Sequence, residues 1–157
     1  DYLKQQNQDI QVWLVDPDGS GIYSYLKNNE YRSSGGSFTE GIGIMRTVDN
    51  FRKAKIDHAV NLPDKDLVAV AHFLAHNDGI VLGSSSALNV AGAIRAAAVS
   101  GPGKTIVTFA CDVGERSFSK LYNQEFLQEK GFPVENESVA ALFKRYQTQA
   151  MDGVVTV

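Results

Sequence analysis

A cluster of hydroxyl groups precedes the most clearly helical part of this chain of 157 residues. The sequence Gly83-Ser84-Ser85-Ser86, here called the serine segment, leads into an alanine-rich stretch that predicts a helix over residues 87–99. Up to three hydroxyls and several free backbone N–H groups would meet at this helix N-terminus. They could hold an anion or direct one hydroxyl at a ligand heteroatom. The alternative is that Ser85 or Ser86 only caps the helix, a role worth about 1 kcal/mol.

Two other segments could serve the same site. Gly41 and Gly43 lie in residues 40–44 and would let the backbone pass close to a ligand. A Gly-x-Gly turn is more often a tight bend, and the third glycine of the dinucleotide-binding fingerprint is absent. Asp112 ends an apolar run and is a good site candidate, although it could simply begin a turn. Its neighbour Cys111 is expected to be an inert core thiol.

Several other functions lack the residues they need. A single cysteine excludes an intrachain disulfide and a thiolate zinc cluster. His72 and His76 are four residues apart but have no third ligand nearby, which disfavours a metal site. The net charge of −3, without a basic run, argues against nucleic acid or an anionic membrane as the main partner. No stretch approaches the roughly 20 apolar residues of a membrane-spanning helix.

The elements that must position these residues alternate between strands and helices, which predicts an α/β fold with an open, mostly parallel sheet flanked by helices. In such sheets ligands bind at the carboxyl ends of the strands, where residues 40–44, 83–86 and 111–116 fall. Strands are predicted over residues 10–15, 56–62, 79–82 and 104–110. Helices are predicted from an N-cap at Asp64 to a stop at residues 77–79, and over residues 87–99, 119–130 and 138–149, with an exposed tail at 152–157.

In this order, the segments resemble the C-terminal part of pyridoxal-phosphate-dependent cysteine synthases, the cystathionine β-synthase and O-acetylserine sulfhydrylase family of fold type II. The resemblance covers residues 10–132. It implies that residues 1–132 form the C-terminal part of the Rossmann-like large domain, incomplete in this chain, and that residues 133–157 form a C-terminal helix and tail. The matching stretches are VDPDGS at 15–20, EGIG at 40–43, GSSS at 83–86, NVAGA at 89–93, TIVT at 105–108, CDVGER at 111–116 and SKL at 119–121.

The resemblance also implies roles for individual residues. Ser85 matches the hydroxyl that hydrogen-bonds the pyridine nitrogen of the cofactor, and a neutral hydroxyl there moderates the electron-sink power of the ring. Gly41 and Gly43 match the loop beside cofactor and substrate, and Cys111 and Asp112 match the strand end near the pyridine edge. Where cystathionine-forming relatives carry Tyr, this chain has Ile44, which favours a small sulfur nucleophile.

The family's Schiff-base lysine and phosphate loop have no counterpart in this chain. No lysine stands in a Ser-x-Lys context and no Gly-Thr-Gly-Gly-Thr loop occurs, so no catalytic residue is assigned and the chain alone is expected to be inactive. The chain begins at Asp1 in what resembles a helix leading into a strand, so we expect a fragment or a processed subunit. A companion N-terminal fragment or chain would supply the missing parts.

The complete enzyme is expected to be a homodimer in the cytoplasm, with the mitochondrion as the alternative compartment, that makes L-cysteine from an activated serine and sulfide. Two alternatives stay open at this point. One is a non-catalytic remnant or regulatory module that kept the fold. The other is an unrelated nucleotide-binding α/β protein that uses the serine segment for phosphate.

Overall fold

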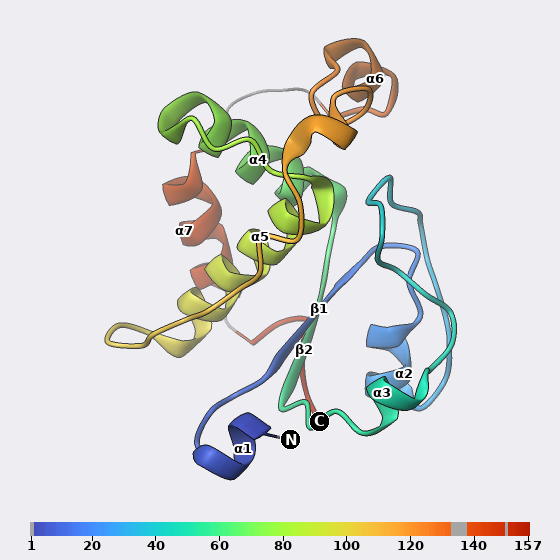
Figure 1. Cartoon of the computed structure of the whole chain (residues 1–157), viewed down its shortest axis with the longest axis vertical. Coiled ribbons are helices and arrows are strands. Elements are labelled where there is room, and N and C mark those ends of the chain that lie inside the picture. Colours follow the sequence, from blue (N-terminus) through green and yellow to red (C-terminus); the bar gives the residue numbers. More distant parts are fainter. Residues whose placement is uncertain (1, 133–137, 150) are drawn as a thin grey trace.

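The computed structural model describes residues 2–132, 138–149 and 151–157, and a small mixed sheet runs through its centre (Figure 1). Strand β1 (Trp13–Pro17) pairs in parallel with β2 (His58–Leu62), with Trp13 opposite His58 and Pro17 opposite Leu62. Strand β3 (Val154–Thr156) pairs antiparallel with the other edge of β2. The predicted α/β class is confirmed, and the sheet contains one parallel and one antiparallel pairing.

The strand predictions differ from the structure at both ends of the chain. The first strand was predicted over residues 10–15 but lies two to three residues later, because the side chain of Asp57 accepts a hydrogen bond from Val12 N at 2.7 Å and holds the approach to β1. The prediction that residues 152–157 form an exposed tail was wrong, because residues 154–156 form strand β3. Its Val154 and Val155 are half-buried in β3, where they pair with Val60 and Ala59.

Two predicted strands do not form. Residues 79–82 make only one isolated bridge, between Leu82 and Val113, and residues 104–110 lie outside every strand of the described chain. Both segments also leave apolar side chains in solvent, since Ile80 and Val107 are exposed. Apolar side chains suit a strand, but a strand also needs a neighbouring backbone to accept its hydrogen bonds.

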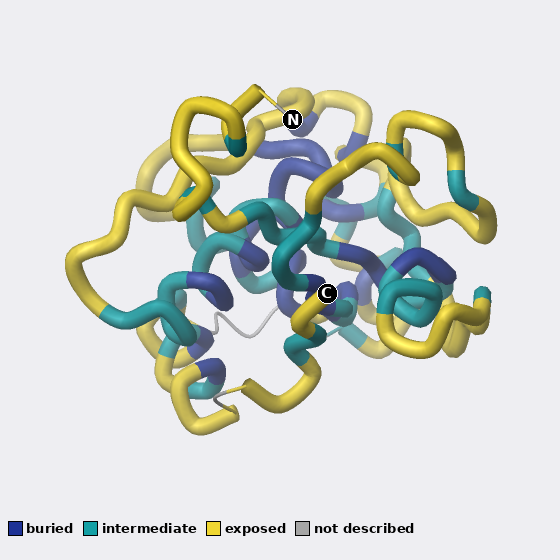
Figure 2. Tube along the Cα trace, turned by 90° about the horizontal axis from the view of Figure 1, so that it is seen from below, coloured by how far each residue is buried: buried dark blue, intermediate teal, exposed yellow. Residues whose placement is uncertain are grey.

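Helix α5 (Ser84–Ser100) packs on strands β1 and β2, α4 (Asp64–Asp78) packs on α5, and α7 (Val139–Gln149) packs against both helices. In Figure 2 the buried segments gather at the middle of the molecule and the exposed ones surround them. The small residues of α5 permit the close packing expected of them, because a Cβ at Gly92 would lie 2.3 Å from a methyl of Val15. The core comprises Val60, Leu62, Leu67, Val68, Val70, Ala71, Ala87, Leu88, Ala91, Leu121, Leu127, Leu142 and Tyr146.

The remaining helices are short. They are α1 (Tyr2–Gln6), α2 (Ile22–Asn28), α3 (Asp49–Arg52), a 3-10 turn (Gly114–Ser117) and α6 (Gln124–Glu129). The helix predicted over residues 119–130 is therefore shorter, since it begins only after Asn123, whose side chain accepts a hydrogen bond from Phe126 N. None of the helices in the described ranges is both long and apolar enough to cross a membrane.

Asp64 is not the N-cap of α4 that the sequence predicted. Pro63 occupies that position, and Asp64 is the first helical residue. Its carboxylate instead accepts hydrogen bonds from the Ser37 hydroxyl and from Phe38 N, which lie 27 and 26 residues earlier. Asp64 thus fixes the loop that leads into Gly41 and Gly43.

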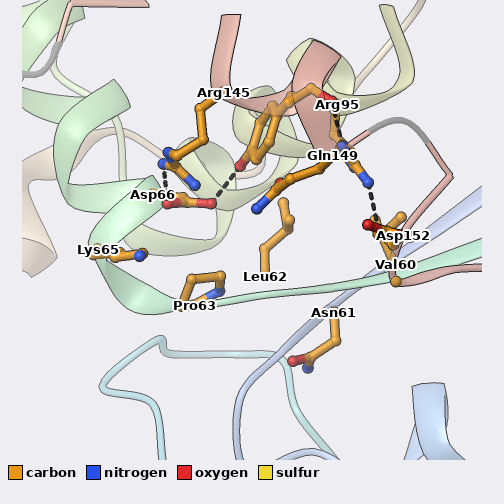
Figure 3. Close-up of a pocket in the computed structure, with 12 residues that line it drawn as sticks. Val60, Asn61, Leu62, Pro63, Lys65, Asp66, Arg95, Arg145, Gln149 and Asp152 are labelled. Carbon is orange, nitrogen blue, oxygen red and sulfur yellow. Dashed lines mark hydrogen bonds and ion pairs between the residues drawn. The ribbon is translucent and has the colours of Figure 1, made fainter. Parts of the chain in front are cut away.

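A buried carboxylate joins α7 to α4. Asp66, only 1% exposed, pairs with Arg145 at 2.6 Å and accepts a hydrogen bond from the Tyr146 hydroxyl (Figure 3). Burial raises the pKa of Tyr146, as do the charge of Asp66 and its hydrogen bond, so the phenol remains a donor. These residues line a cavity of about 370 Å³, where Arg95 donates to the carbonyls of Tyr146 and Asp152. The cavity's charged groups therefore stabilise the end of α7.

The predicted division at residues 132/133 falls beside residues 133–137, which lie outside the described part of the chain. It stays a prediction. Helix α7, in the second unit, packs on helices α4 and α5 of the first unit.

Replacing Tyr146 by Phe removes one donor to the buried Asp66 while keeping the aromatic volume. We expect the free energy of unfolding to fall by about 1–3 kcal/mol, measured by urea denaturation followed by circular dichroism. Tyr2→Phe is the matched control, because Tyr2 is 69% exposed and its loss of a hydroxyl should leave the midpoint unchanged. Equal midpoints for both variants would contradict the role given to the Tyr146 hydroxyl.

Candidate cofactor site

The serine segment forms the first turn of α5. The helix begins at Ser84 and not at residue 87, with Gly83 as N-cap and no side-chain capping hydrogen bond. The reading of Ser85 or Ser86 as a helix cap is therefore wrong. All three serines are helical residues and are buried.

The three serine side chains have different surroundings. Ser84 Oγ accepts a hydrogen bond from Glu40 N at 3.1 Å, which ties α5 to the loop at residues 40–44. Ser86 Oγ donates to the carbonyl of Asp112 at 2.9 Å and accepts from Asp112 N at 3.1 Å. The hydroxyl of Ser85, a residue only 7% exposed, has no hydrogen-bond partner among the described residues. Ser85 is therefore the hydroxyl left for a ligand.

Asp112 and Gly83 are in direct contact. Gly83 N donates to the carbonyl of Asp112 at 3.1 Å, and a Cβ at Gly83 would lie 2.0 Å from the Asp112 carboxylate. Only glycine permits this approach. Tyr122 strengthens the same edge, because its hydroxyl donates to the Leu82 carbonyl at 2.8 Å and accepts from Leu82 N at 3.0 Å. Burial raises the pKa of Tyr122, which keeps the hydroxyl protonated.

The glycine loop is anchored at both ends. Gly41 and Gly43 have φ of +80° and +87°, a region that favours glycine. Ser20 Oγ accepts from Ile44 N at 3.2 Å and donates to its carbonyl at 3.1 Å, which holds the loop after Gly43. On the other side, Lys120 pairs with Glu40. The hydrogen bond from Lys120, and then its charge, lower the pKa of Glu40.

Cys111 is exposed, so its prediction as a core thiol was wrong. Asn89 Nδ2 lies 3.4 Å from its sulfur and donates to the carbonyl of Phe109 at 3.1 Å. The position of Cys111 thus depends on a side chain from the second turn of α5. Sequence reasoning included Asn89 only in a matching stretch, because its partners lie 20 and 22 residues further along the chain.

Two of the three predicted site segments touch the serine segment: residues 40–44 through Ser84, and Asp112 through Gly83 and Ser86. Cys111 is linked to the same helix through Asn89. The described residues contain no group of three His, Cys, Asp or Glu side chains that could hold a metal ion. What the arrangement offers is the unpartnered hydroxyl of Ser85, a residue only 7% exposed, beside a glycine loop. That hydroxyl fits a ring nitrogen, to which it can donate a hydrogen bond.

Comparison with known proteins defines the class. A family model described as "Pyridoxal-phosphate dependent enzyme" matches residues 1–112, and the chain belongs to this family. Within it, the chain is 41% identical to a cysteine synthase of Dictyostelium discoideum over 147 residues, and 42% identical to cysteine synthase 2 of Schizosaccharomyces pombe over 142 residues. These matches cover 87% and 82% of this chain. The resemblance predicted from the sequence is confirmed.

Solved structures of the same kind share the fold. O-acetylserine sulfhydrylase isoform 3 of Entamoeba histolytica superposes with a TM-score of 0.69 over 92% of this chain, at 26% identity. An O-acetylserine-dependent cystathionine β-synthase of Helicobacter pylori superposes with a TM-score of 0.66 over 76% of it, at 28% identity. The chain spans only 36–39% of the length of these four relatives.

Replacing Gly83 by Ala places a methyl group against the Asp112 carboxylate, and residues 82–83 must move away from Asp112. We expect a loss of about 1–3 kcal/mol in unfolding free energy, as for other overpacked sites, measured by urea denaturation. Gly36→Ala is the control, because a Cβ there meets nothing within 4 Å. If both variants unfolded at the same urea concentration, the close contact of Gly83 and Asp112 would be refuted.

Proposed function

We propose that this chain supplies the ring-nitrogen side of the pyridoxal 5'-phosphate site of a cysteine synthase. The observation that carries the proposal is the Ser85 hydroxyl, which belongs to a residue only 7% exposed and has no partner in the described structure, whereas the hydroxyls on either side are engaged. A hydroxyl that no other group of the described chain engages is available to donate a hydrogen bond to a ring nitrogen. The family to which the chain belongs uses this cofactor.

The reaction we propose for the complete enzyme replaces the leaving group on the β-carbon of an activated serine by sulfide and yields L-cysteine. Pyridoxal phosphate, when bound, supplies the electron sink for this chemistry. Ser85 would hold the ring nitrogen by a neutral hydrogen bond and leave it without a positive charge. Gly41 and Gly43 would bring a backbone without side chains alongside cofactor and substrate, and Cys111 and Asp112 would border the ring edge.

The remaining parts of the site must come from elsewhere. A Ser-x-Lys lysine and a phosphate loop do not occur in this sequence, so we infer that an N-terminal fragment or companion chain of the same enzyme provides them. That the related proteins are two to three times as long supports this inference. Ile44, in place of a tyrosine, supports a small sulfur nucleophile as acceptor.

Two wider expectations accompany this proposal. The complete enzyme is expected to act as a homodimer. We also propose that it acts in the cytoplasm, with the mitochondrion as the other compartment. One relative, from Saccharomyces cerevisiae, is itself described as a putative mitochondrial cysteine synthase.

The role of Ser85 can be tested in the chain co-expressed with the part of the Dictyostelium cysteine synthase that it does not match. We expect a yellow complex in which Ser85→Ala shifts the visible absorption band of the cofactor and weakens cofactor binding about tenfold, the worth of one hydrogen bond. Ser100→Ala, at the opposite end of the same helix, should change neither. An unshifted spectrum with unchanged affinity in Ser85→Ala would refute the assignment.

A further inference from the structure

The segment that follows α5 has the side-chain pattern of a strand but no strand partner. Val107 and Phe109 are 82% and 75% exposed, whereas the Thr108 hydroxyl between them donates to the Asn89 carbonyl on α5. Figure 1 shows this segment running back along α5. Hydrogen bonds to Asn89 hold it beside the helix, while all of residues 104–110 are exposed and several of them are apolar.

The backbone of this segment is also not paired with another part of the backbone. No backbone–backbone hydrogen bond involves residues 104–110 within the described ranges. The contacts that hold it come from Asn89, which donates to the Phe109 carbonyl and accepts from Thr108. An extended apolar stretch with free N–H and C=O groups is a template for pairing with another strand.

The accessible surface area of the chain also indicates that a partner covers part of it. Its accessible surface is 9405 Å², whereas a compact monomer of 17.1 kDa would expose about 7,800 Å². The excess exceeds the roughly 800 Å² that each partner contributes to a standard protein interface. The exposed apolar side chains include Ile80, Val81, Ile106, Val107, Phe109 and Val113, all from the two predicted strands that do not form or from the residues beside them.

We propose that residues 105–110 are the docking strand for the companion polypeptide, which adds a strand along this segment and covers Val107 and Phe109. This inference rests on the proposed function and specifies where the partner binds. The segment runs directly into Cys111 and Asp112, and Asp112 contacts the serine segment. A strand paired here would therefore bring its own residues next to Ser85.

A second copy of this chain is the weaker occupant. It would cover the same apolar groups, but its sequence contains no Ser-x-Lys lysine or phosphate loop and would leave the site incomplete. The companion region would cover the apolar side chains of residues 105–110 and would also supply the missing lysine and phosphate loop. The preferred occupant is thus the N-terminal region of a cysteine synthase.

The test uses the whole chain co-expressed with the non-matching part of the Dictyostelium cysteine synthase. Val107→Pro removes one N–H from the segment, and Val107→Lys places a charge on its exposed face. Leu3→Lys is the matched control, because Leu3 is also an exposed apolar residue but belongs to α1, which is distant in sequence from residues 105–110. Affinity is measured by sedimentation and the amides of residues 105–110 by hydrogen exchange.

We expect a one-to-one complex in which these amides become protected. Both Val107 variants should weaken it at least tenfold and Leu3→Lys should leave it unchanged. If the complex forms without protecting residues 105–110, or if the Val107 variants bind normally, the docking inference is overturned while the proposed function survives. If docking occurs as expected but the complex takes up no cofactor, the proposed function fails and the docking inference stands. Self-association through the segment, or no complex, overturns the docking inference.

Discussion

The contact between Gly83 and Asp112 is the constraint on which the candidate site depends. It brings the start of α5 against a segment almost 30 residues further along the chain, and it tolerates no side chain at Gly83. Once Ser86 has bonded to Asp112 and Ser84 to Glu40, the first turn of α5 is fixed from two sides. Ser85 between them is then held with its hydroxyl unpartnered, which is the form of a preorganised ligand group.

The body of the fold uses a different kind of anchor. Apolar packing of α4 and α5 on the sheet supplies the core, while buried polar groups decide how the outer elements attach. Asp66 fixes α7 through Arg145 and Tyr146, and Asp64 fixes the approach to the glycine loop. Because a buried carboxylate is costly unless it is paired, such contacts permit few alternative arrangements. They position the loops that the site requires.

Residues 105–110 differ from this interior, because their apolar side chains are exposed and their backbone has no backbone partner. The side chains that the sequence marks as core are available, yet the backbone partner that would make them a strand is not among the described residues. The chain matches less than two fifths of the length of related cysteine synthases. The exposed surface lies next to the candidate site, so one partner could cover the surface and supply the parts that the proposed cofactor site still needs.

The sequence by itself determined the α/β class, helices α4, α5 and α7, the β2 strand and the family, because these follow from local periodicity and from motifs in order. Tertiary structure alone decided that residues 79–82 and 104–110 are not strands and that residues 154–156 are one, since strand formation depends on a neighbouring backbone. The resemblance had singled out Ser85, but only the tertiary structure shows that its hydroxyl is the one without a partner. The partners of Ser84 and Ser86 lie 44 and 26 residues away, and no local pattern encodes which hydroxyl such distant partners will leave free.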